Sequence, residues 1–179
     1  QNIWPINQLF NGLVKLDKNL RIQPEIASSW TISQDGLTYE FSLRKDVFFH
    51  SSPLFGQKST RSVVASDFVY SFDRLKDPSI ASPGGWVLQQ VESYKAIDEH
   101  TFSIQLKKSF PAFLGLLSMR YCAVVPHEVV SHFGSSFRSN PIGTGPFYFK
   151  RWDENVKLVL RKNIQYFELV KQGQKLPYL

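Results

Sequence analysis

Residues 30–43 read WTISQDGLTYEFSL, and this stretch decides the fold. Its Asp35-Gly36 pair separates two runs rich in β-branched and aromatic residues, and Asp-Gly is a favoured two-residue hairpin turn. After the turn, apolar side chains recur at every second position, at Leu37, Tyr39, Phe41 and Leu43. Because the side chains of a strand alternate between its two faces, this spacing predicts an antiparallel hairpin with one buried face.

The same pattern occurs twice more along the chain. Residues 93–106 and residues 145–161 each hold two apolar runs around a short polar turn. In the first of these, Phe102, Ile104 and Leu106 share one strand face. Each segment therefore predicts a further hairpin.

A helix is predicted for residues 65–75. Phe68, Phe72 and Leu75 fall on one stripe at helical spacing, and Asp67 suits the positive end of the helix dipole in the first turn. We expect the helix to end at Asp77, because the residue before a proline resists the helical conformation.

Shorter helices are predicted for residues 111–117 and 127–133, each next to a proline that the first helical turn tolerates. Residues 50–62 are polar and interrupted by proline and glycine, so they are predicted to form a loop. Residues 121–125 have the composition of a buried strand, with the lone Cys122 as a core thiol. These elements together indicate an α+β fold of antiparallel hairpins with short helices.

The composition narrows the function classes. Apolar residues make up 42% of the 179 residues and aromatic residues 15%, enough for a packed core. No apolar run is long enough to cross a membrane, so no span is expected. The net charge is +6, but the basic residues are scattered, which argues against nucleic acid as a partner. The sequence opens at Gln1 without a leader, so we expect any export signal to lie outside it.

Catalytic and metal-binding motifs gain no support. His127 and His132 are five residues apart, which places them on different faces of a helix, whereas a zinc helix needs a spacing of four. Gly143-Thr144-Gly145-Pro146 precedes a predicted strand rather than a helix, so it is interpreted as a tight turn and not a phosphate loop. No catalytic residue, metal ligand or cofactor is predicted.

Five segments, in order, resemble the peptide-, dipeptide- and nickel-binding family of solute-binding proteins that serve ABC importers. They are residues 9–14 (LFNGLV), 24–30 (PEIASSW), 35–45 (DGLTYEFSLRK), 65–75 (ASDFVYSFDRL) and 140–147 (NPIGTGPF). The resemblance covers essentially the whole chain, although members of the family are about three times as long.

The resemblance implies a periplasmic-binding-protein-like fold of type II (cluster C), in which two lobes close on a ligand. This chain would hold part of the N-terminal lobe, an incomplete clamp. Residues 1–10 would begin the first lobe, residues 11–141 would form a smaller α+β sub-domain, and residues 142–179 would return into the first lobe. The second lobe would lie beyond residue 179.

The function implied is that of a substrate-binding component of an ABC importer, which binds short peptides for uptake and is not an enzyme. Its partners would be a short peptide and the membrane permease, and the protein would be a monomer. It would be extracytoplasmic, either periplasmic or a membrane-anchored lipoprotein. Two alternatives stay open: the same fold binding a nickel chelate or other small solute, and a hydrolase or metal enzyme.

The resemblance also implies the ligand-binding residues Trp86, Met119, Arg120 and Tyr121. Peptide-binding relatives often place an aromatic residue after the Ser-Pro pair, where this chain has Gly84, with Trp86 two residues further on. Arg120 lies near an arginine that binders of nickel complexes use. The alternatives are that Trp86 packs in the core and that Arg120 forms an ordinary surface ion pair.

Overall fold

The computed structural model describes residues 6–153 and 156–168. The chain forms two compact units, each built from segments distant in sequence. Unit 1 contains Gln1–Phe10, Asp46–Val63 and Val125–Leu179, and unit 2 contains Asn11–Lys45 and Val64–Val124. The lobe boundaries expected at residues 10/11 and 141/142 remain a prediction, and the compact units differ from them in assigning residues 46–63 and 125–141 to unit 1.

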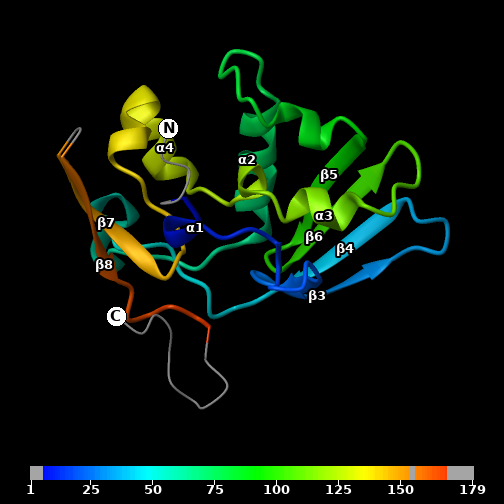
Figure 1. Cartoon of the computed structure of the whole chain (residues 1–179), viewed down its shortest axis with the longest axis horizontal. Coiled ribbons are helices and arrows are strands. Elements are labelled where there is room, and N and C mark those ends of the chain that lie inside the picture. The colour runs from blue at the N-terminus through cyan, green and yellow to red at the C-terminus, as the bar shows by residue number, and fades with distance from the viewer. Residues whose placement is uncertain (1–5, 154–155, 169–179) are drawn as a thin grey trace. The chain divides into compact units, whose positions relative to one another are not determined.

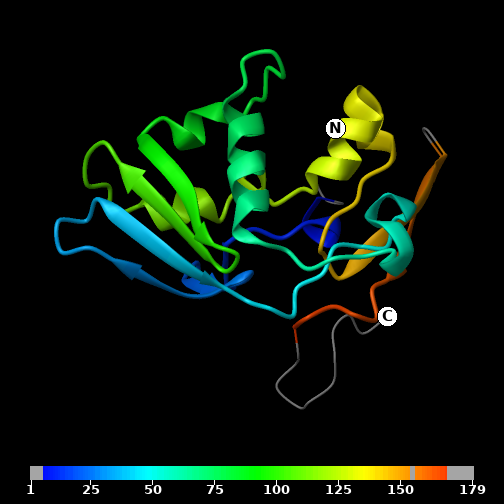
Figure 2. The same cartoon turned by 180° about the vertical axis from the view of Figure 1, so that it is seen from behind.

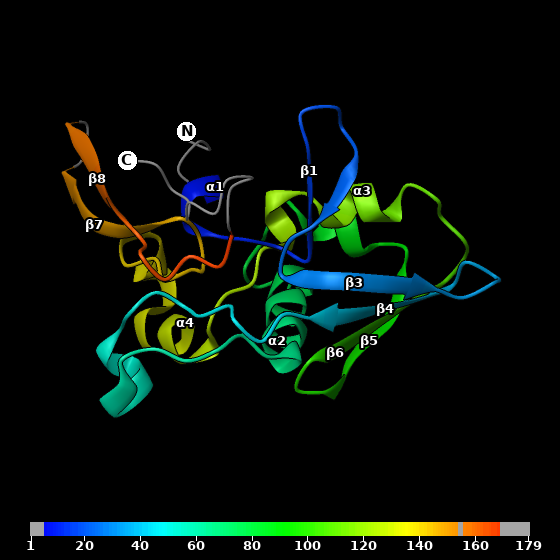
Figure 3. The same ribbon diagram turned by 90° about the horizontal axis from the view of Figure 1, so that it is seen from below.

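Unit 2 is built on a four-stranded antiparallel sheet in the order β3-β4-β6-β5. Its strands are β3 (Ala27–Ile32), β4 (Thr38–Leu43), β5 (Val91–Asp98) and β6 (Thr101–Leu106). The two hairpins predicted here are confirmed, and Gly36 takes the positive φ of 70° that its turn requires. Tyr39, Phe41 and Leu43 are buried as their spacing predicts. Figure 3 shows β3 and β4 side by side.

Helix α2 (Ala65–Lys76) packs on this sheet and confirms the predicted helix (Figure 1). Phe68 and Phe72 lie 5.6 and 5.5 Å, between ring centroids, from Phe102 of β6. All three rings are fully buried, and burial of each contributes about 1.5–3 kcal/mol to folding. The view from behind shows the same helix against the sheet (Figure 2).

The ends of α2 follow the predicted signals. The Asp67 carboxylate accepts the Val64 N–H at 2.9 Å, which satisfies a backbone donor at the helix N-terminus. At the other end, Asp77 has an extended backbone with ψ 113°, so the helix stops before Pro78 as expected.

The rest of unit 2 consists of short elements. They are β1 (Val14–Leu16) paired with β2 (Ile22–Pro24), the 3-10 turn η2 (Gly85–Leu88), α3 (Phe113–Leu117) and the 3-10 turn η3 (Arg120–Cys122). The prediction of a strand at residues 121–125 is wrong, because the Cys122 N–H donates to the Met119 carbonyl at 2.9 Å and closes a turn. The burial predicted for Cys122 is confirmed.

Unit 1 holds the third predicted hairpin, which is confirmed, and several short helices. Its elements are α1 (Ile6–Leu9), the 3-10 turn η1 (Pro53–Lys58), α4 (His127–Phe133), the 3-10 turn η4 (Gly134–Ser139), β7 (Phe147–Asp153) and β8 (Lys157–Lys162). Gly143 and Gly145 pass close to the chain at α1, where a Cβ on either would collide with the Leu9 or Gln8 carbonyl. The predicted turn is confirmed and needs glycine for this close approach.

The segment predicted as a loop at residues 50–62 is more ordered than expected, since it contains η1. Ser52 caps this turn, and its hydroxyl accepts the Leu54 N–H at 3.3 Å. Arg61 then binds the Glu128 carboxylate with two hydrogen bonds of 2.6 and 2.8 Å. A proline at the start of a helical turn and a bidentate ion pair explain why this polar segment is ordered.

Within residues 6–153 and 156–168, no helix combines the length and the apolar character that a membrane crossing requires.

Candidate functional site

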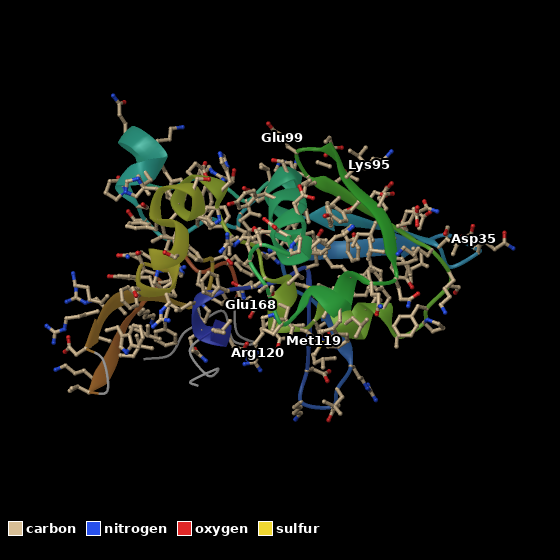
Figure 4. All side chains as sticks on the ribbon, turned by 90° about the horizontal axis from the view of Figure 1, so that it is seen from above. Asp35, Lys95, Glu99, Met119, Arg120 and Glu168 are labelled. Carbon is tan, nitrogen blue, oxygen red and sulfur yellow. The ribbon has the colours of Figure 1, made fainter. Side chains whose placement is uncertain are left out.

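The four predicted site residues all lie in unit 2, on two short turns. Trp86 belongs to η2, Met119 immediately precedes η3, and Arg120 and Tyr121 open η3. The Trp86 side chain is 51% exposed, so the alternative of core packing is wrong in this structure. Arg120 is exposed and Met119 is half-buried. Figure 4 places Met119 and Arg120 beside each other, well apart from Asp35 at the tip of the β3–β4 hairpin.

Buried neighbours hold the two turns in place. In η2, Val87 and Leu88 are buried directly after Trp86, and in η3, Cys122 is buried directly after Tyr121. Both turns contact α2, which packs on the sheet. The exposed aromatic side chains are therefore carried on fixed backbone, which suits residues that bind a ligand.

The structure brings the two turns together at Gly84. A Cβ on this glycine would lie 2.5 Å from Cδ1 and 2.6 Å from Cβ of Tyr121, so the tyrosine covers the glycine directly. Sequence reasoning missed this contact. The one signal available was Gly84 itself, a glycine at a position where the resemblance leads one to expect an aromatic residue.

Cys122 lies next to these residues, but its thiol is poorly reactive. Burial raises the pKa of its thiol from 9.0 to about 12. The sulfur lies 3.8 Å from the Leu116 carbonyl oxygen, a weak hydrogen bond. A nucleophilic or metal-binding cysteine needs a lowered pKa, so the position and pKa of Cys122 fit a structural thiol.

Unit 1 contains a histidine with a strongly lowered pKa, His50, which the sequence analysis did not single out. His50 is buried, and its Nδ1 accepts the Gly143 N–H at 3.3 Å. The ring proton must therefore be on Nε2, which donates to the Gly145 carbonyl at 2.9 Å. Burial lowers the pKa of His50 to about 4, against a smaller opposing effect of the Gly145 carbonyl. The neutral imidazole thus fixes the turn at residues 143–146.

The histidines of α4 have separate surroundings. The Nδ1 atom of His127 lies 3.3 Å from the Glu128 carboxylate, and the His132 ring packs edge-on against Phe133 at 4.8 Å. Within the part of the chain that the structure describes, no three His, Cys, Asp or Glu side chains gather as a metal site would require.

Unit 1 also contains a cavity of about 500 Å³. It is lined by Asp46, Phe48, Thr60 and residues 164–167, and it includes none of the predicted site residues. Phe48 and Ile164 are exposed there, by 39% and 78%. The sequence carried no sign of this cavity, because its walls come from three separate segments.

Comparison with known proteins identifies the family. The family model of bacterial extracellular solute-binding proteins, family 5 Middle, matches residues 21–179. The chain belongs to this family, as the five sequence segments predicted.

Individual relatives agree with this assignment. The probable di/tripeptide-binding protein 5 of Pseudomonas aeruginosa is 34% identical over 176 aligned residues, which cover 89% of this chain and 33% of that protein. Among solved structures, the periplasmic binding protein DppA of Helicobacter pylori in complex with the peptide STSA has a TM-score of 0.79 at 28% identity, over 90% of this chain and 35% of that one.

A third relative carries a different ligand. NikZ of Campylobacter jejuni in complex with Ni(L-His) has a TM-score of 0.78 at 31% identity, over 90% of this chain and 31% of that one. The predicted α+β, periplasmic-binding-protein-like fold is confirmed by these likenesses. The chain spans about a third of the length of the relatives it matches.

The burial of Cys122 predicts very slow labelling of the native protein by an aromatic disulfide reagent at pH 8. A rise in pKa from 9.0 to about 12 makes the reactive thiolate about a thousandfold scarcer, and burial blocks access as well. The same protein in concentrated urea should react at the rate of a free thiol. Native labelling as fast as the unfolded control would show an accessible, activated cysteine and revive the nucleophile hypothesis.

The burial of His50 predicts acid sensitivity. Its folded pKa of about 4 lies below the ordinary value of 6.5, so between these values the unfolded chain binds the extra proton. The contribution of His50 to the free energy of unfolding is therefore fully present above pH 6.5. It is lost as the pH falls toward 4, by up to roughly 3 kcal/mol at 1.4 kcal/mol per pKa unit. Urea unfolding across this range should give a steeper pH dependence for wild type than for His50→Gln.

His132→Gln is the matched control for this comparison, because His132 is an exposed histidine of the same unit. It should retain the wild-type pH dependence. If the free energy of unfolding depended on pH equally in wild type and in His50→Gln, the account of a neutral, buried His50 would be contradicted.

Proposed function

We propose that this chain is part of the substrate-binding component of an ABC importer, and that the protein binds short peptides without changing them chemically. The family membership supports a solute-binding role. The name of the Pseudomonas relative and the peptide in DppA support peptides as the solute. The protein would act as a monomer outside the cytoplasm, in the periplasm or on a lipid anchor, and deliver its ligand to a membrane permease.

Within this chain, we propose that Trp86, Met119, Arg120 and Tyr121 contact the solute. The observation that carries this proposal is the exposure of Trp86 and Tyr121, by 51% and 36%, on turns whose adjoining residues are buried. Large aromatic side chains on a fixed surface supply contact area at a low cost in conformational entropy. Arg120 adds a cationic group that suits a carboxylate on the solute.

A non-catalytic role is supported by the state of the nucleophile and metal-ligand candidates. Cys122 has a raised thiol pKa and is buried, so it is poorly suited to attack a substrate. His127 and His132 have different partners on α4. Neither arrangement favours a hydrolase or a metal enzyme.

A nickel chelate or another small solute is the second candidate. One observation favours it: NikZ, which resembles this chain as well as DppA does, was solved with Ni(L-His). An exposed Arg120 would serve an anionic chelate as well as a peptide carboxylate.

Replacement of Trp86 tests the proposed site. Titration calorimetry with short peptides should show that Trp86→Ala weakens binding by about tenfold, because truncation of an aromatic anchor commonly costs more than 1 kcal/mol. The melting temperature should change little, since the Trp86 side chain is half exposed. The protein is to be used at its natural length.

Ile97→Ala is the matched control, because Ile97 is a similarly exposed apolar residue of unit 2, at 49%, on β5. It should bind peptide as wild type does. Peptide binding that is equally strong in wild type and Trp86→Ala would remove Trp86 from the site. Binding of nickel-histidine instead of any peptide would favour the second candidate.

A further inference from the structure

The contact between Gly84 and Tyr121 is unusually close. A Cβ built on Gly84 would lie 2.5 Å from Cδ1 and 2.6 Å from Cβ of Tyr121, and closer still to Cγ. Real Cβ atoms essentially never approach other heavy atoms to within 3.0 Å. Because the Cβ of Tyr121 is one of these neighbours, rotation of the ring alone would not make room. Tyr121 therefore occupies the space that any side chain at residue 84 would need.

The backbone on the Gly84 side of this contact is held in place. The Gly84 N–H donates to the Ser82 hydroxyl at 3.3 Å, and its carbonyl accepts the Val87 N–H at 3.0 Å. A Cβ on the next residue, Gly85, would lie 3.2 Å from the Leu75 carbonyl, so this turn also lies tightly against the end of α2. The turn that carries Gly84 therefore has a fixed backbone and lies against α2.

Although its backbone is fixed, Tyr121 keeps 36% of its surface exposed, and Trp86 keeps 51%. Tyr121 covers Gly84, and Trp86 follows Gly84 by two residues, so this glycine links the two exposed aromatic residues. Aromatic faces favour contact with apolar and planar groups, so the chemistry offered is that of a pocket wall for an apolar side chain.

We propose that Gly84 is a positioning residue that sets the specificity of the solute site. By having no side chain, it allows Tyr121 to lie on the 82–85 turn, and Tyr121 together with Trp86 then forms a wall that selects solutes with a bulky apolar side chain. This inference rests on the proposed function, because it specifies the preference of the same peptide site.

The experiment compares two probes, the tripeptides Ala-Phe-Ala and Ala-Ala-Ala, by titration calorimetry on the protein at its natural length. Wild type should prefer the phenylalanine peptide. Gly84→Ala and Tyr121→Ala should each reduce this preference by about three- to tenfold, the range expected for loss of one aromatic contact. Tyr121→Phe, which retains the ring, should keep it.

The double variant separates positioning from general damage. Gly84→Ala should lower the preference and the melting temperature only while residue 121 has a side chain, so Gly84→Ala/Tyr121→Gly, which removes the Tyr121 Cβ as well, should match Tyr121→Gly in both. Gly115→Ala is the control for an added methyl group, because no atom lies within 4 Å of a Cβ built there. It should leave the preference at the wild-type value and should not lower the melting temperature, since alanine suits the interior of α3 better than glycine.

The possible failures are distinguishable. If wild type binds neither tripeptide, the proposed peptide function is wrong, and the inference falls with it. If wild type binds both peptides but without preference, or if Tyr121→Ala keeps the preference, the function stands and the inference is overturned. Full additivity of Gly84→Ala and Tyr121→Gly would also overturn it, because Gly84 would then act independently of Tyr121.

Discussion

The packing of α2 on the four-stranded sheet is the interaction on which the proposed site depends. Phe68 and Phe72 of the helix enclose Phe102 of β6, and this aromatic core fixes the helix against the sheet. The turns η2 and η3 both contact α2. A loss of this core would therefore release both turns at once, and with them every residue proposed to touch the solute.

Each of the two turns combines an exposed aromatic residue with buried neighbours. In η2 and η3, one aromatic residue faces solvent while the next residues are buried, at Val87 and Cys122. The buried residues provide stability, and the exposed ones are available for recognition. In unit 1, the buried His50 similarly stabilises a turn, through hydrogen bonds to Gly143 and Gly145, without any sign of chemistry at its ring.

Much of the fold was predictable because the decisive signals are local. The period-two apolar pattern after Asp35-Gly36 predicted the first hairpin, and the helical stripe of Phe68 and Phe72 predicted α2. The apolar run at residues 121–125 led to the wrong prediction of a strand, because a short buried turn and a short buried strand have the same composition. The contact of Gly84 with Tyr121 joins residues far apart in sequence, and no local pattern encodes such a contact. The four site residues came from resemblance alone, and the structure adds their exposure and their place on two turns.

Native mass spectrometry tests the proposed role of the protein as a peptide receptor most directly. The protein at its natural length would be purified gently and weighed before and after mild denaturation. A set of released masses that match short peptides is the predicted result. A protein that carries no ligand and also ignores added peptides, or that releases one discrete non-peptide compound, would contradict the claim.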